Sequence, residues 1–305
     1  MSIQKYQALL KTAELGNITR AAEQMGYTQP AVSKMISDLE AEWGVTLLQR
    51  NKSGIQVTSA TKYLLPILKA ISEDCAELEY CIGELRGQRT GLVRVAAFAS
   101  VVDNCIPQII RRFQSSYPDI NIDLRISENY LEIENWIMKG EVDCGFVSVP
   151  TTYDLDLSFY KQDELIAVLP ADHPLAEASY FPVAQLEREP SIILKEVVDF
   201  EVMHFLDQLS GEVKPHYLVN GDHTILAMIE AGLGISVMHS MIMESDRYRV
   251  VWKPFDIHQY RSICIATQNS RRVPSLVRLF IQSAIGALAA ADAPPDSMRE
   301  KRKAL

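Results

Sequence analysis

A row of polar side chains near the start of the chain has the chemistry that reading a DNA duplex requires. Its members are Gln29, Ser33, Lys34 and Ser37. An amide can bond an adenine edge, a hydroxyl can bond a base or a phosphate, and lysine favours guanine or the backbone. Because the four recur at helical spacing, a helix here presents them all on one face. The row therefore predicts a recognition helix that enters the major groove.

A recognition helix needs a core behind it and a second helix to hold it. Apolar residues fall on its opposite face, at Val32, Ile36, Leu39 and Trp43. Just upstream, Gly26 is well placed to end a shorter helix in the left-handed conformation, and Thr28 can cap the helix that follows. A further helix is predicted over residues 3–15, with Ser2 as its cap. This pattern predicts a helix-turn-helix, although any small three-helix bundle can show it.

Short strand-like runs at residues 45–49 and 55–58 enclose a stretch of turn-forming residues, which predicts a β-hairpin wing. Arg50 and Lys52 near its tip are predicted phosphate contacts, and the alternative is a hairpin that only faces solvent. The complete set of candidate DNA-binding residues is Thr19, Arg20, Thr28, Gln29, Pro30, Ser33, Lys34, Ser37, Arg50 and Lys52.

Composition limits the class of protein. The chain has 305 residues, of which 48% are hydrophobic and 23% charged, as in soluble globular proteins of about two to three domains. Charge appears too early for a secretory signal, and no apolar run is long enough to cross a membrane, so we expect a cytoplasmic protein with no membrane partner. The five cysteines show neither C-x-x-C nor zinc-finger spacing, which predicts reduced thiols.

The net charge of −9 is unevenly distributed. Residues 1–60 hold six basic and five acidic side chains, a net charge of +1, whereas the remainder holds 24 basic and 34 acidic ones, a net charge of −10. DNA binding is therefore expected only at the N-terminus, and so few basic residues need two or more copies for good affinity. We expect a homodimer or homotetramer on double-stranded DNA with a pseudo-palindromic operator.

Apolar residues spaced alternately by three and four positions run through residues 60–86. They are Leu64, Leu68, Ile71, Cys75, Leu78, Ile82 and Leu85. A sustained repeat of about 3.5 residues is typical of a coiled-coil seam. The simplest partner is a second copy of the chain, and the alternative is packing on the chain's own C-terminal half. Cys75 lies on this seam, where a thiol is more often inert than a crosslink.

After a polar break rich in glycine near residue 87, strand-like and helical stretches alternate. The expected strands are residues 92–97, 120–126, 144–148, 165–170, 191–194, 235–238 and 262–267. The expected helices are residues 105–117, 130–139, 202–209, 224–231 and 274–290. Alternation of this kind predicts an α/β domain.

Several short segments of the sequence resemble those of a known family. They are TRAAEQM, TQPAVSKMISDLE, GVTLLQR, PQIIRRFQSSYP, KGEVDCGFV, ELIAVLPADHPLA and MIEAGLGISVM. In this order they resemble LysR-type transcriptional regulators over nearly the whole chain. Thr61 departs from the family, which commonly has Gly there. The resemblance implies an α/β fold class with an N-terminal all-α winged helix-turn-helix and a C-terminal two-lobed, periplasmic-binding-protein-like (type II) domain.

The same resemblance implies a division of the chain. Residues 1–59 form the winged helix-turn-helix, residues 60–87 a dimerisation helix and residues 88–291 the effector-binding domain. The composition of residues 292–305, DAPPD followed by REKRK, cannot form a core and predicts a disordered tail. Within the effector-binding domain, lobe one comprises residues 92–161 and 267–290, and lobe two residues 162–266. The chain then crosses twice between lobes, and ligands in such folds bind between them.

Ser100 is the foremost candidate effector contact, because a hydroxyl beside free helix N–H groups can hold an anionic or polar group. The positions implied by the family are Ser100, Val101, Glu128, Asn129, Val147, Ser148, Val198, Asp199, Phe200 and Asp222. Where the family often has Thr or Arg to hold carboxylates, this chain offers several acids. An amine or a strongly hydroxylated ligand is then more plausible than a carboxylate, although each acid alone is explained as a solvated loop residue.

Catalysis and metal binding find no support in the sequence. The histidines lack ligand spacing, no G-x-S-x-G elbow is present, and the glycines around residue 232 do not make a dinucleotide loop. We expect no enzyme activity and no cofactor besides a small-molecule effector. The alternatives are a solute-binding protein or enzyme with an added helical N-terminus, and a regulator whose C-terminal domain only oligomerises.

Overall fold

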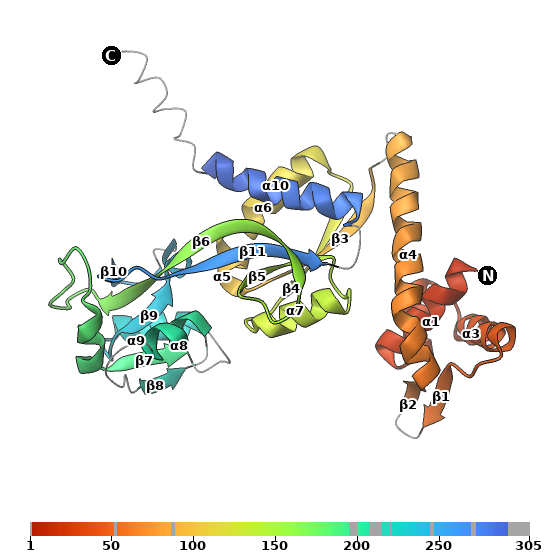
Figure 1. Cartoon of the computed structure of the whole chain (residues 1–305), viewed down its shortest axis with the longest axis horizontal. Helices are drawn as coiled ribbons and strands as arrows, with labels where there is room; N and C mark the ends of the chain where they lie inside the picture. The colour runs from red at the N-terminus through yellow and green to blue at the C-terminus, as the bar shows by residue number, and fades with distance from the viewer. Residues whose placement is uncertain are drawn as a thin grey trace, which may run out of the picture. The chain divides into compact units, whose positions relative to one another are not determined.

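The computed structural model describes residues 2–51, 54–86, 89–194, 200–207, 215–219, 221–244, 247–269 and 273–291. The chain folds as two compact units, Met1–Arg89 and Thr90–Leu305 (Figure 1). The predicted tail at residues 292–305 lies outside the described residues. No helix among the described segments is long and apolar enough to span a membrane.

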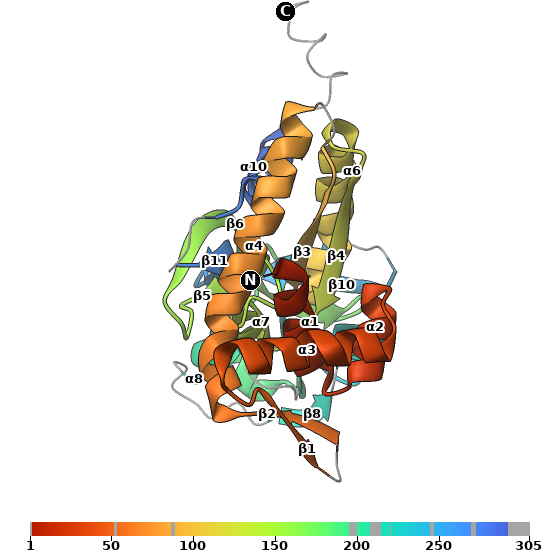
Figure 2. The ribbon, with the colours of Figure 1, turned by 90° about the vertical axis from the view of Figure 1, so that its right-hand side faces the viewer.

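The N-terminal unit contains helices with a small hairpin. Its elements are α1 (Ile3–Leu15), α2 (Ile18–Met25), α3 (Gln29–Trp43), β1 (Leu48–Asn51), β2 (Gly54–Val57) and α4 (Ser59–Leu85). The bounds predicted for α1 are confirmed. The hairpin was predicted at residues 45–49 and 55–58, but its strands lie at Leu48–Asn51 and Gly54–Val57, with Leu48 paired to Val57 and Asn51 to Gly54. Figure 2 shows this hairpin as β1 and β2.

Helix ends in this unit are only partly those expected. Gly26 ends α2 with φ 69°, a left-handed conformation that confirms its predicted role. Ser2 and Thr28 precede α1 and α3 as predicted but make no side-chain capping bond. Asn17, which the sequence did not single out, caps α2 by accepting from the amides of Thr19 and Arg20.

The core of the unit lies where α1, α3 and α4 meet. Leu9, Val32 and Leu39 are fully buried, and Leu68 from α4 joins them with 4% of its surface exposed. Thr61, also fully buried, donates its hydroxyl to the Leu47 carbonyl at 2.6 Å, which fixes the start of α4 against the hairpin. These contacts hold the helix-turn-helix and the start of the long helix together.

Helix α4 shows that the apolar repeat has two different uses. Leu64 and Leu68 pack into the core of their own unit. Beyond them, Leu78, Ile82 and Leu85 are 60%, 39% and 89% exposed. The first part of the predicted seam is therefore used inside the chain, and the seam offered to a partner begins later than predicted.

The C-terminal unit is built on two sheet regions joined by long strands. The strands are β3 (Gly91–Ala97), β4 (Ile120–Ile126), β5 (Cys144–Val149), β6 (Leu155–Pro170), β7 (Ser191–Leu194), β8 (Pro215–Val219), β9 (Ser236–His239), β10 (Val250–Pro254) and β11 (Tyr260–Gln268). In the first region β11 lies between β6 and β5, followed by β3 and β4. In the second, β9 and β10 flank the C-terminal end of β6, and β7 pairs with β8.

Helices cover these sheets. They are α5 (Ala99–Asn104), α6 (Ile106–Ser116), α7 (Tyr130–Met138), α8 (Phe200–Asp207), α9 (Asp222–Glu230) and α10 (Ser275–Ala291), with 3₁₀ helices η1 (Val183–Arg188) and η2 (Ser240–Glu244). Figure 1 shows α6 and α10 over one face of the first region and α7 on the other, and an edge-to-face contact joins Phe113 to Phe280.

Residues 165–169 of β6 are all buried because both faces of the sheet are covered. Leu165, Ala167 and Leu169 pack into one core cluster, and the alternating residues Ile166 and Val168 pack into another. Successive side chains of a strand point to opposite faces, so a strand covered on both sides reads as continuously apolar. This explains why residues 165–170 were recognisable as a strand.

The long strands β6 and β11 run from one lobe to the other (Figure 1). The expected lobe boundaries at residues 161 and 266 fall within these continuous strands. The helix predicted at residues 105–117 lies at Ile106–Ser116 and is preceded by a separate helix, α5, from which Cys105 divides it. Strands β8 and β10 were missed because their sequences are short and carry proline at one end.

Candidate functional site

Helix α3 presents the predicted polar row to solvent. Gln29, Lys34 and Ser37 are exposed and Ser33 is half-buried. The apolar face is buried as predicted, with Val32, Ile36 and Leu39 at no more than 3% exposure. The predicted orientation of α3 is confirmed, and contact of these side chains with DNA stays a prediction.

The N-terminal end of α3 is suited to a phosphate. Thr28 and Pro30 there are exposed, and the first turn contains no acidic residue. Unpaired amide groups and the helix dipole favour an anion at such an end. Thr19 and Arg20 are exposed at the start of α2.

Lys34 is the basic side chain of the row. Its Nζ lies 3.8 Å from Asp38, but 78% of its surface is exposed, so the pair is weak. Lys34 can exchange this partner for a phosphate or a base. Arg50 lies on β1 and its side chain is not described, and Lys52 lies outside the described residues.

Ser100 lies in the first turn of α5, where it meets an arginine that the sequence analysis missed. Its Oγ accepts from Nη2 of Arg261 at 2.9 Å, and Nη1 of Arg261 donates to the Tyr130 hydroxyl at 2.7 Å. The guanidinium also lies over the ring of Phe98, 4.8 Å from its centroid. Ser100 and Arg261 are 8% and 3% exposed.

Asp163 neutralises this arginine. Its Oδ2 accepts from Nε and Nη2 of Arg261 at 3.0 and 2.6 Å, and its Oδ1 accepts from the Ser240 hydroxyl and the Met241 amide at 2.7 and 3.0 Å. We call Ser100, Tyr130, Asp163, Ser240 and Arg261 the Arg261 cluster.

The charges in the cluster set the titration of Asp163. Desolvation by burial alone raises its pKa, but the Arg261 charge, the neighbouring His239 and the hydrogen bonds from Ser240 and Met241 outweigh it. The pKa of Asp163 therefore lies below its ordinary value, and the carboxylate remains charged. Arg261 comes just before the apolar run of residues 263–266, but Asp163 lies among polar neighbours at residues 161–164, so no local pattern in the sequence marks the pair.

The other predicted effector residues have varied surroundings. Val101, Val147 and Ser148 are buried, Glu128 is exposed and Asp222 is half-buried. Asn129 caps α7 by accepting from the amides of Leu131 and Glu132, which is a structural use of its oxygen. Val198 and Asp199 lie outside the described residues, and the side chain of Phe200 is not described.

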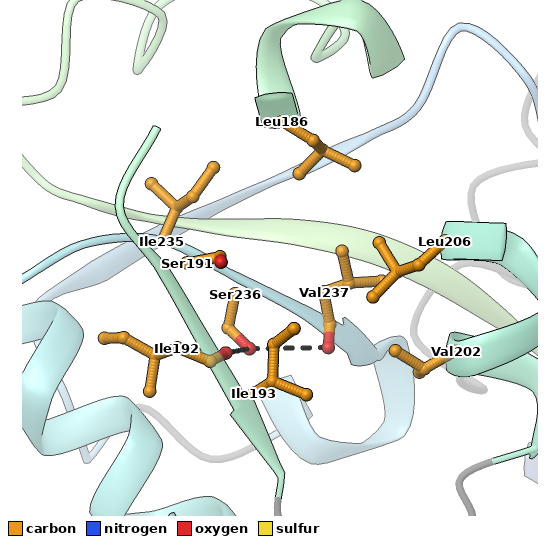
Figure 3. Close-up of a pocket in the computed structure, with 9 residues that line it drawn as sticks. All are labelled: Leu186, Ser191, Ile192, Ile193, Val202, Leu206, Ile235, Ser236 and Val237. Carbon is orange, nitrogen blue, oxygen red and sulfur yellow. Dashed lines mark hydrogen bonds between the residues drawn. The ribbon is translucent and has the colours of Figure 1, made fainter. Parts of the chain in front are cut away.

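A small pocket lies elsewhere, in the core beside β7 and β9 (Figure 3). Its lining is mostly apolar, from Leu186, Ser191, Ile192, Ile193, Val202, Leu206, Ile235, Ser236 and Val237. The Ser236 hydroxyl donates to the Ile192 carbonyl at 2.7 Å. None of the predicted effector residues that the structure describes lines this pocket, and its described lining contains no charged group.

In the part of the chain that the structure describes, neither the cysteines nor the potential metal ligands are arranged as a reactive site. Cys105, Cys144 and Cys264 are buried, and Cys75 and Cys81 are half-buried. Burial raises the pKa of Cys144, and Asp143 raises it further. Within the described residues, no group of His, Cys, Asp and Glu could hold a metal ion.

Comparison with known families decides what these sites belong to. The family model described as the LysR substrate binding domain matches residues 86–289, and that of the bacterial regulatory helix-turn-helix protein, lysR family, matches residues 3–62. The chain belongs to the LysR family of transcriptional regulators. Its N-terminal unit is the DNA-binding domain of a LysR-type regulator, and its C-terminal unit is the substrate, or effector, binding domain. The family consists of regulators and not of enzymes.

Relatives extend over most of the chain. The HTH-type transcriptional regulator YvbU of Bacillus subtilis (strain 168) is 27% identical over 287 residues, which cover 93% of this chain and 98% of YvbU. The regulator CbbR of Rhizobium meliloti (strain 1021) is 30% identical over 251 residues, 78% of each chain.

Solved structures share the fold of the whole chain. Full-length OxyR C199D from Pseudomonas aeruginosa matches with a TM-score of 0.72 and 21% identity, covering 93% of this chain and 94% of OxyR. Full-length CbnR in complex with its target DNA matches with a TM-score of 0.56 and 21% identity, covering 93% of this chain and all of CbnR, 100%. The helical DNA-binding domain followed by a type II periplasmic-binding-protein-like domain is therefore confirmed.

Proposed function

We propose that this LysR-family regulator reads a pseudo-palindromic operator as a homodimer or homotetramer, and that a small molecule between the lobes of its C-terminal unit controls it. The DNA-reading part of this proposal rests on one observation: α3 exposes its polar row and buries its opposite, apolar face. Gln29, Ser33 and Lys34 are assigned to bases, and Thr19, Arg20, Arg50 and Lys52 to the backbone. A regulator of this kind acts in the cytoplasm, where the operator is.

A second copy of the chain is the proposed partner of α4. Leu78, Ile82 and Leu85 form an exposed apolar row that costs free energy while it faces water. Pairing two such helices buries both rows and brings two recognition helices to one operator. The N-terminal unit holds few basic side chains, so this doubling supplies the affinity that one copy lacks.

The proposed effector site lies around Ser100. Polar side chains meet there in the Arg261 cluster, with the Phe98 ring against the guanidinium. Asp163 already neutralises Arg261, and Glu128 and Asp222 add negative charge to the predicted lining. We therefore expect an uncharged, hydroxyl-bearing molecule or an amine. It controls the protein only if it binds one arrangement of the lobes better than another.

One observation favours a second candidate function, an effector-independent regulator whose C-terminal unit only oligomerises. The hydroxyls of Ser100 and Tyr130 already bond to Arg261, so the cluster satisfies itself without a ligand. Thermal unfolding of the purified chain with a panel of amines and polyols separates the two candidates. A molecule that raises Tm of the wild type but not of Ser100→Ala supports the effector site, and no shift across the panel favours the alternative.

Selection of binding sites from random DNA duplexes tests the DNA-reading half. We expect enrichment of a two-fold related site, with the logarithm of affinity falling steeply against the logarithm of salt concentration. Absence of any enriched site at low and high salt would mean that α3 does not read sequence.

A further inference from the structure

The Arg261 cluster joins groups that belong to different lobes. Ser100 on α5 and Tyr130 at the start of α7 follow strands of the first sheet region, whereas Ser240 begins η2, directly after β9 of the second. Arg261 and Asp163 lie between them, directly opposite each other where β11 pairs with β6. A chain of hydrogen bonds therefore runs from one lobe to the other through this ion pair.

A second link runs beside the first. The side-chain amide of Asn104 at the end of α5 donates both to the Ser100 carbonyl at 2.9 Å and to the Met241 carbonyl at 2.8 Å. It therefore ties α5 to η2 directly. Any rotation that moves α5 away from η2 must break this bond as well as a bond of the Arg261 cluster.

The parts of this connection differ in strength. Asp163 and Arg261 lie on strands that are paired with each other, so their mutual bonds survive when the lobes separate. The bonds from Arg261 to Ser100 and Tyr130 join a cation to neutral hydroxyls on other elements. Each hydrogen bond to a charged group shifts an opening equilibrium by about tenfold or more. The hydroxyls are therefore the part that opening breaks.

We infer that the Arg261 cluster is a latch between the lobes, which holds α5 to η2 and releases when Arg261 loses the hydroxyls of Ser100 and Tyr130. Arg261 and Asp163 act here as positioning residues. The effector enters only through the proposed function: a ligand that offers its own oxygens to Arg261 replaces these hydroxyls and changes the lobe arrangement.

The test removes the hydroxyls and keeps the ion pair. Replacing Arg261 would leave Asp163 as an unpaired buried charge and unfold the domain, so Ser100→Ala combined with Tyr130→Phe is the informative variant. The matched control is Ser236→Ala combined with Tyr153→Phe. It removes the same chemical groups, but their bonds, to the Ile192 carbonyl and to Asn135, stay within one lobe each.

Amide hydrogen exchange in the full chain, without DNA or effector, is the measurement. The side-chain amide of Asn104 donates to the Met241 carbonyl, so its exchange reports the separation of α5 from η2. We expect this exchange, and that of the α5 backbone amides, to accelerate together by about tenfold or more in the latch variant, and to remain unchanged in the control. Acceleration of the α5 and α7 backbone amides without that of the Asn104 side chain, or equal acceleration in the control, would overturn the latch.

This test is independent of DNA reading and of any ligand. A negative result leaves operator selection untouched, and a failed operator selection leaves the exchange rates untouched. The two proposals can therefore fail separately.

Discussion

Asp163 and Arg261 face each other across β6 and β11 and form a buried ion pair. The distance from Asp163 Oδ2 to Arg261 Nη2 is 2.6 Å, and the side chains are 0% and 3% exposed. Neither charge is solvated by bulk water, so each depends on the other and on the surrounding hydroxyls and amides. Loss of either side chain leaves an uncompensated charge inside the domain.

The first prediction concerns this carboxylate. Asp163→Asn should lower the free energy of unfolding of the C-terminal unit at neutral pH by about 3 to 5 kcal/mol, because Arg261 then lacks its counter-ion. Denaturant unfolding of both proteins measures the difference. Asp172→Asn, at an exposed position, is the matched control and should change stability little.

The difference in stability between wild type and Asp163→Asn should change with pH in one direction. The folded-state pKa of Asp163 lies below its ordinary value, so its stabilisation is fully present above the unfolded-state pKa of about 3.9. It is lost as pH falls through the lower folded-state pKa. The difference between wild type and Asp163→Asn should therefore shrink below about pH 4. A difference that grew on acidification would contradict the assigned charge state.

The second prediction concerns sequence reading. Gln29→Ala should weaken discrimination between operator and non-operator duplexes by about 1 to 3 kcal/mol, because a bidentate amide contact is lost. Competition binding measures it. Gln7→Ala removes the same side chain from an exposed position of α1 and should leave discrimination intact.

The third prediction concerns the cap at the start of α2, the helix that precedes α3. Asn17 accepts from the amides of Thr19 and Arg20 at 2.8 and 3.1 Å, so Asn17→Ala should destabilise α2 by about 1 kcal/mol. Hydrogen exchange of the α2 amides reports this loss. Ser2→Ala changes a position before α1 whose side chain makes no capping bond, and exchange in α1 should barely respond.

The fourth prediction concerns oligomerisation. Leu78→Glu places a charge in the exposed apolar row of α4, where a partner helix would have to desolvate it, and should shift the protein towards monomer. Ala76→Glu adds the same charge at an exposed position off the row. Sedimentation equilibrium should show dissociation for the first variant only. Equal behaviour would place the subunit interface elsewhere.

The fifth prediction concerns the thiols. Burial raises the pKa of Cys144, and it raises that of Cys264 despite a backbone hydrogen bond from Tyr160. A thiol-specific reagent should therefore label Cys81 of α4 before these two, because Cys81 is half-buried and lies off the apolar row proposed for the subunit interface. Labelling of Cys144 or Cys264 in the folded protein as fast as in the denatured protein would be inconsistent with their burial.

Much of the N-terminal unit was predictable because its structure is local. The start and end of α1, the inward face of α3 and the left-handed Gly26 depend on residues a few positions apart, where helical spacing and glycine conformation act directly. Asn17 escaped notice because several polar residues near it could equally have served as the cap.

The sequence by itself determined the helix-turn-helix, the long apolar repeat and the α/β alternation, since each is a pattern of neighbouring residues. Only the tertiary structure decided that Leu68 packs into its own unit and that Arg261 meets Asp163, 98 residues earlier in the chain. The pairing register of β6 and β11 places those charges opposite each other, and no local spacing encodes it. Ser100 was expected to contact an effector; the same register brings Arg261 to its hydroxyl, and effector binding there stays a prediction.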